Sequence, residues 1–184
     1  MKITRWIWID RIANISIVAM AIFAAILLCG RYRSDWRSDV VVPAGSATQL
    51  QQVNWAGNGL TIVLALSTEC RFCSANAGLY SEIASTLRTK QVGRTIAIFP
   101  QDLSHSRAYL ARLKVTPDEI RQGSIASAGA KATPTIIAIG SDGRVLKSWV
   151  GGLSEGDAAG VLREISAIAE RPRTALCSPC ASSR

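Results

Sequence analysis

Five cysteines, four of them in two closely spaced pairs, are the residues of this chain best suited to chemistry. Cys70 and Cys73 form one C-x-x-C pair, Cys177 and Cys180 form a second, and Cys29 stands alone. Cysteines at this spacing carry out redox reactions or bind metal. A structural disulfide and half of a zinc site are the alternatives for the first pair.

The segments around the first pair favour redox chemistry. Residues 61–66 (TIVLAL) are a continuous apolar run, typical of a strand buried on both faces of a sheet. After the pair, Leu79, Ile83 and Leu87 recur at every fourth position, which predicts a helix that ends near residue 89. The pair therefore lies where a buried strand gives way to a helix.

This position has a chemical consequence. A cysteine at the start of a helix has its thiolate stabilised by free backbone N–H groups and by the helix dipole. Cys73 lies one turn further along, within disulfide reach of Cys70. We therefore predict that Cys70 is the exposed nucleophile and that Cys73 resolves the mixed disulfide.

The rest of the pattern predicts an α/β fold with a mixed sheet. Five more elements are predicted in order. They are a buried strand at residues 95–99, a helix at 103–113, and two strands at 135–139 and 145–150 that a Ser-Asp-Gly turn joins. The fifth is a closing helix that begins at Ser154.

The chain has a strand that leads to Cys70-Arg71-Phe72-Cys73, then a helix, and later Ala132-Thr133-Pro134 before a hairpin. With these elements in this order, residues 55–170 resemble the thioredoxin-like superfamily. By layout, the chain is most similar to the membrane-tethered periplasmic oxidoreductases of the TlpA-like group. The resemblance implies a three-layer sandwich and disulfide exchange with extracytoplasmic proteins. It also implies that Pro134 is a cis-proline beside the catalytic cysteines and that Thr133 modulates them.

Five positions depart from the superfamily's pattern. Glu69 replaces a frequent tryptophan, Arg71-Phe72 replaces a common proline-containing pair, and Gly78 replaces a frequent helix proline. Leu64 stands where cytosolic thioredoxins have a buried acid. We expect the positive charge of Arg71 to favour the Cys70 thiolate.

No organic cofactor is expected, because the cysteine pair itself carries two electrons and no glycine motif that cradles phosphate is present. The net charge of +8 comes from scattered basic residues, and no dense basic run indicates nucleic-acid binding. The expected partners are protein thiols or disulfides.

A non-catalytic scaffold or a protein that binds zinc or copper is the alternative function. His105 is the only histidine, and we interpret it as a surface residue rather than a copper ligand. Cys177 and Cys180 are a possible second redox pair, with a local disulfide or metal binding as alternatives. We predict no metal site.

The amino-terminal residues predict a membrane anchor. After a short flank over residues 1–11, residues 12–30 contain an uncharged run long enough for a helix to span the hydrocarbon core. Trp6, Trp8, Tyr32 and Trp36 flank the run, as expected at two membrane interfaces. A cleaved signal peptide is the alternative.

The anchor sets the expected location of the other parts of the chain. Residues 31–54 are predicted to be a stalk, and residues 171–184 a tail that carries the second C-x-x-C pair. The basic residues on the two sides of the run balance, so charge alone does not decide the orientation. A short leading flank and paired cysteines favour a single-pass inner-membrane protein with its domain in the periplasm or outside the cell.

Overall fold

The computed structural model describes residues 16–29 and 40–170. The chain divides into two units, residues 1–39 and 40–184, and each is described by itself. The predicted flank over residues 1–11 and the tail with Cys177 and Cys180 lie outside the described residues.

The described part of the first unit is a helix over residues 16–29, with every side chain exposed. Its large apolar residues include Ile17, Phe23 and Leu28, which are 62%, 62% and 68% exposed. Within the described ranges, no helix is both long enough and apolar enough to cross a membrane. The anchor predicted over residues 12–30 extends past the described helix at both ends.

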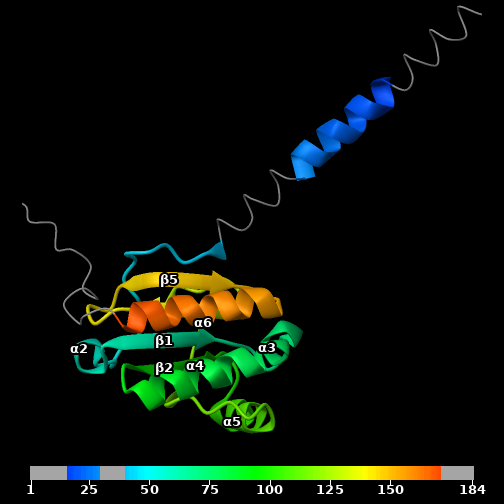
Figure 1. Cartoon of the computed structure of the whole chain (residues 1–184). Coiled ribbons are helices and arrows are strands. Elements are labelled where there is room, and N and C mark those ends of the chain that lie inside the picture. The colour runs from blue at the N-terminus through cyan, green and yellow to red at the C-terminus, as the bar shows by residue number, and fades with distance from the viewer. Residues whose placement is uncertain (1–15, 30–39, 171–184) are drawn as a thin grey trace, which may run out of the picture. The chain divides into compact units, whose positions relative to one another are not determined.

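The second unit is built on a five-stranded mixed sheet with the order β3-β2-β1-β4-β5, shown in Figure 1. The three strands β1 to β3 are parallel, β4 runs antiparallel to β1, and β4 and β5 form an antiparallel hairpin. The strands are β1 (Leu60–Ala65), β2 (Gly93–Phe99), β3 (Glu119–Gln122), β4 (Thr135–Ile139) and β5 (Val145–Val150). The predicted α/β class, the mixed sheet and the hairpin are confirmed.

The central strand β1 is buried along its whole length, because it has neighbours on both edges and is covered on both faces. Alternate side chains of β1 enter two separate apolar clusters, as the period of a strand requires. Ile62 and Leu64 face one cluster, while Val63 and Ala65 face the other. The loop that follows β1 leads to Cys70.

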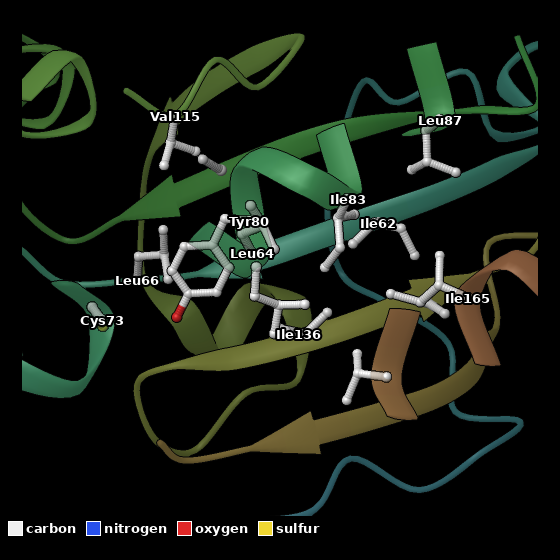
Figure 2. Packing of buried hydrophobic residues seen from close by; sticks show 14 of the residues in the cluster. Ile62, Leu64, Leu66, Cys73, Tyr80, Ile83, Leu87, Val115, Ile136 and Ile165 are labelled. Atoms are coloured by element: carbon white, nitrogen blue, oxygen red, sulfur yellow. The ribbon is translucent and has the colours of Figure 1, made fainter. Parts of the chain in front are cut away.

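The longer helices contribute to the cluster on the Ile62 face of the sheet. They are α4 (Ala77–Lys90), α5 (Leu103–Arg112) and α6 (Glu155–Ala169). Helices α4 and α5 connect parallel strands that are added in one direction, and right-handed crossovers place both on the same face. Figure 1 shows α4 and α6 lying across this face, and Figure 2 shows Ile83 and Leu87 of α4 packed with Ile165 of α6.

The opposite face of the sheet is covered by short segments rather than by long helices. Its cover consists of η1 (Ile125–Ala128), the Trp55 side chain of α2 (Trp55–Asn58) and residues that precede α2. Val42 is 5% exposed and packs against the sheet. Its N–H donates to Ser148 Oγ at 3.0 Å, and that hydroxyl donates back to the Val42 carbonyl at 3.0 Å.

The domain therefore starts near Val40 rather than at residue 55, where the sequence patterns place the end of a stalk. Ala47 also forms a bridge with Arg144 next to β5. Of the predicted stalk, residues 40–54 belong to the domain, and residues 31–39 lie outside the described residues.

The sequence patterns also miss β3, whose residues read Glu-Ile-Arg-Gln. A single apolar residue gives no run and no alternation that would indicate a strand. The strand forms because it pairs with the edge of β2, and Arg121 also donates to the Gln51 carbonyl at 2.6 Å.

Candidate active site

Cys70 stands at the start of a short helix that the sequence analysis merged with the next one. Helix α3 (Arg71–Ala75) has Cys70 as its N-cap, with extended backbone angles, and the Cys73 N–H donates to the Cys70 carbonyl at 3.0 Å. Helix α4 starts anew after Asn76. The predicted position of Cys70 at the start of a helix is confirmed.

Asn76 separates the two helices, and the sequence analysis missed it. Its amide nitrogen donates to the Phe72 carbonyl at 3.0 Å, and its amide oxygen accepts the Leu153 N–H at 3.3 Å. The side chain is buried and ties the cysteine helix to the loop before α6. Asparagine commonly binds local backbone groups instead of continuing a helix, which is the signal that could have revealed the break.

The two thiols are free and differ in their surroundings. Cys70 is partly exposed, whereas Cys73 is fully buried. Burial raises the pKa of Cys73 to about 12, and the neighbouring Cys70 sulfur adds to this effect. Cys73 therefore stays protonated at neutral pH.

Cys70 shows the opposite behaviour. Its partial burial opposes ionisation, but hydrogen bonds from the Cys73 thiol and from the Thr133 side chain favour the thiolate. Backbone N–H groups of Phe72 and Cys73, at the start of α3, act in the same direction. Together these groups hold the pKa of Cys70 below its ordinary value of 9.0.

Thr133 and Pro134 lie beside Cys70 although they are distant in sequence. The Cys70 thiol donates to the Thr133 carbonyl at 3.4 Å, and the Thr133–Pro134 peptide bond is cis, as the resemblance implies. Pro134 is buried, and its carbonyl accepts the Gly151 N–H at 2.8 Å. The structure thus brings together Cys70, Cys73, Thr133 and Pro134.

Arg71 and Phe72 are both exposed, on the turn between the two cysteines. The Arg71 guanidinium carbon lies 4.6 Å from the centroid of the Phe72 ring. The groups that lower the Cys70 pKa are Cys73, Thr133 and Phe72, and Arg71, which was expected to contribute, is not among them. Arg71 and Phe72 instead form a mixed cationic and apolar surface at the active site.

An open pocket of about 400 Å³ adjoins the cysteine loop. It is lined by residues of that loop, of α5 and of the segment just before α5, which include Thr68, Glu69, Gln101, His105, Tyr109 and Arg112. Glu69 is exposed, as expected for a solvated loop charge, and the exposed His105 ring contacts the Asp102 carboxylate. Among residues 16–29 and 40–170, no three His, Cys, Asp or Glu side chains form a group that could hold a metal ion.

Two buried tyrosines near Cys73 are a second feature that the sequence analysis missed. Tyr80 and Tyr109 are 1% and 5% exposed, and neither hydroxyl has a partner within hydrogen-bond geometry. Burial raises the pKa of both hydroxyls, and the charge of an ionised Cys73 raises it further. The polar side chains of Asn76, near Tyr80, and of Ser74, near Tyr109, offset only part of this rise. A periodicity argument counts Tyr80 only as an apolar residue of the helix. It therefore gives no sign that the Tyr80 hydroxyl is buried in the same cluster as Cys73.

Comparison with solved structures identifies the fold. A putative thiol:disulfide interchange protein DsbE from Chlorobium tepidum is 16% identical, with 70% of this chain and 95% of that chain covered and a TM-score of 0.53. A secreted thiol-disulfide isomerase from Corynebacterium glutamicum is 17% identical, with 71% and 86% covered and a TM-score of 0.52. No family model and no curated protein sequence matches the chain. One of these structures is named for thiol:disulfide interchange and the other for thiol-disulfide isomerisation, and their likeness to this chain confirms the predicted thioredoxin-like fold.

Proposed function

We propose that this chain is a thiol-disulfide oxidoreductase that exchanges disulfides with proteins through Cys70 and Cys73. One observation carries the proposal: Cys70 is partly exposed at the N-cap of α3, whereas Cys73 is fully buried one helical turn further along. These surroundings displace the two thiol pKa values in opposite directions, below 9.0 at Cys70 and to about 12 at Cys73. An accessible thiolate and a protected partner thiol are what a two-step exchange requires.

The first step forms a mixed disulfide. The Cys70 thiolate attacks one sulfur of the substrate disulfide, and a new S–S bond forms as the substrate's own S–S bond breaks. The second substrate sulfur leaves with the bonding electron pair and takes a proton from solvent. The exposed side of Cys70 and the neighbouring Phe72, which is 46% exposed, give a protein substrate access and an apolar contact.

The second step releases the reduced substrate. Cys73 loses its proton and its sulfur attacks Cys70 Sγ, so that the Cys70–Cys73 disulfide forms and the bond to the substrate breaks. The substrate has then gained two electrons and two protons, which the cysteine pair has lost. The reverse sequence oxidises a substrate dithiol.

Thr133 contributes on the side of Cys70 that faces the β4 strand. Its carbonyl accepts a hydrogen bond from the protonated Cys70 thiol, while its side chain favours the thiolate. Thr133 therefore orients the Cys70 sulfur in both protonation states. The names of the two similar structures state thiol-disulfide chemistry, which supports the same activity for this chain.

The activity is tested by reduction of insulin disulfides with the full chain and a dithiol as electron donor. We expect Cys70→Ser and Cys73→Ser to abolish turnover, whereas the matched variant Cys29→Ser retains it. Equal activity of the wild-type chain and both active-site variants would refute the proposal. Zinc or copper retained at one equivalent per chain would favour the alternative of a metal-binding protein.

We also propose that the domain is tethered to the inner membrane and lies outside the cytoplasm. The uncharged residues 12–29 with flanking aromatic residues support this location, as do the exposed apolar side chains of the helix over residues 16–29. A reporter enzyme that is active only outside the cytoplasm, fused after Arg184, should be active. It should lose that activity when residues 2–39 are deleted, and an inactive full-length fusion would contradict the proposed location.

A further inference from the structure

The resolving step of the proposed function requires a negative charge on a buried sulfur. Cys73 is fully buried and must become an anion before it attacks Cys70. Where the resemblance places a buried acid, this chain has Leu64, which is fully buried. Among residues 40–170, no Asp or Glu residue is buried, so no buried carboxylate stands ready to take the Cys73 proton.

Buried hydroxyls occupy this region instead. Tyr80 and Cys73 belong to one apolar cluster, and the Tyr80 hydroxyl is buried without a hydrogen-bond partner. Figure 2 shows the Tyr80 ring beside Leu64 and Leu66, with its hydroxyl directed away from α4 and toward the end of the cluster where Cys73 lies. The charge of an ionised Cys73 also acts on this hydroxyl more strongly than the charge of Cys70 does.

A buried hydroxyl without a partner is costly to a fold, so its position calls for a reason. A donor that is free in the resting state is available when charge develops close to it, and it is strongest in surroundings that exclude water. Burial keeps the Tyr80 hydroxyl protonated, so it acts as a donor and not as a base.

We propose that the Tyr80 hydroxyl stabilises the Cys73 thiolate during the resolving step, in place of a buried carboxylate. This inference rests on the proposed oxidoreductase function. The Cys73 proton passes to solvent, and the Tyr80 O–H donates a hydrogen bond to the sulfur anion and keeps its own proton. The anion then attacks Cys70 Sγ, the Cys70–Cys73 bond forms, and the substrate sulfur leaves with the electron pair and takes up a proton.

Tyr80 is a better candidate for this role than Tyr109. Tyr80 lies on α4, which follows the cysteine helix directly, and it is 1% exposed. Tyr109 lies on α5 and lines the open pocket that Glu69 also lines, and its ring forms a T-shaped pair with the Phe99 ring. Tyr109→Phe is therefore a variant of identical chemistry in a different position.

The test separates the two steps of one reaction. The full chain, with Cys29, Cys177 and Cys180 replaced by serine, is reduced and mixed with dithiobis-nitrobenzoate, whose released thiolate absorbs visible light. Attack by Cys70 gives a first phase of release, and attack by Cys73 on the mixed disulfide gives a second. Stopped-flow absorbance measures both rates.

We expect Tyr80→Phe to slow the second phase by about tenfold or more, the effect of losing a hydrogen bond to a charged group, and to leave the first phase unchanged. Thr61→Val is the matched control, because Thr61 also has a buried hydroxyl without a partner, at the opposite end of β1 from the cysteine loop. This control should change neither phase.

The outcomes are distinct. An unchanged second phase in Tyr80→Phe, or a second phase slowed only in Tyr109→Phe, would overturn the role of Tyr80 and leave the proposed function intact. A wild-type chain without a second phase would instead refute the proposed function. Because the first phase needs an intact site around Cys70, its unchanged rate in Tyr80→Phe also shows that the variant is folded.

Discussion

Selective alkylation of Cys70 in the folded, reduced chain is the most direct consequence of the site geometry. The pKa of Cys73 is about 12 and that of Cys70 lies below 9.0. At neutral pH the thiolate fraction of Cys70 therefore exceeds that of Cys73 by at least about 1,000-fold. A thiolate of lower pKa is also a weaker nucleophile, which reduces the expected ratio of rates to roughly 30- to 60-fold.

Burial makes this ratio a lower limit, because Cys73 is fully buried and iodoacetamide must reach its sulfur. The assay is a time course of iodoacetamide labelling at neutral pH, quenched with acid and followed by mass spectrometry of the separate cysteine peptides. Labelling in concentrated urea is the control, since both cysteines should then react at similar rates.

Cys70→Ser provides a second control for the same argument. In this variant Cys73 loses its sulfur neighbour but keeps its burial, which is the larger cause of its raised pKa. Cys73 should therefore remain slow to react. Labelling of Cys73 within a few-fold of the Cys70 rate in the folded chain would refute the assigned roles of the two thiols.

Three further predictions test the surroundings of the site and the fold. Thr133→Val should raise the pKa of Cys70, because a side-chain hydrogen bond to the thiolate is lost; an unchanged midpoint in the pH dependence of alkylation would argue against this role. Ser148→Ala should lower the free energy of unfolding in urea by about 2 kcal/mol, because it leaves the Val42 N–H and carbonyl without their partner, and a negligible change would contradict the placement of residues 40–54 in the domain. Asp118 has a pKa below its ordinary 3.8, since its partial burial is outweighed by hydrogen bonds from the backbone and a side chain of β2. Its carboxylate therefore stabilises the fold above pH 3.8, and this contribution is lost as the pH falls below that value. The difference in unfolding free energy between wild type and Asp118→Asn should therefore shrink in acid. A difference that does not depend on pH would exclude the role of the charge.

Local sequence patterns were sufficient for the central elements of the fold. The apolar runs of β1 and β2 and the turn between β4 and β5 are signals contained in short segments. The structure has strands at both apolar runs and on both sides of the turn. The edge strand β3 and the break at Asn76 were missed, because each depends on partners elsewhere in the chain. The pairing of Val42 with Ser148 joins residues 106 positions apart, and no local pattern indicates it.

For the candidate site, the sequence by itself predicted Cys70 as the nucleophile and Cys73 as its resolving partner, and it placed the pair at the start of a helix. These follow from the spacing of Cys70 and Cys73 and from the apolar run before them, since helix geometry places residues one turn apart side by side. The confirmed cis bond before Pro134 was implied by resemblance to a known superfamily and not by physical chemistry.

Only the tertiary structure decided how the two thiols differ. The pKa of Cys73 depends on burial by segments distant in sequence, and that of Cys70 depends in part on Thr133, 63 positions away. The Tyr80 hydroxyl likewise becomes buried in the cluster that holds Cys73 only when α4 packs onto β1. Burial and long-range hydrogen bonds set the energy of a charge, and both are properties of the packed chain and not of any one segment.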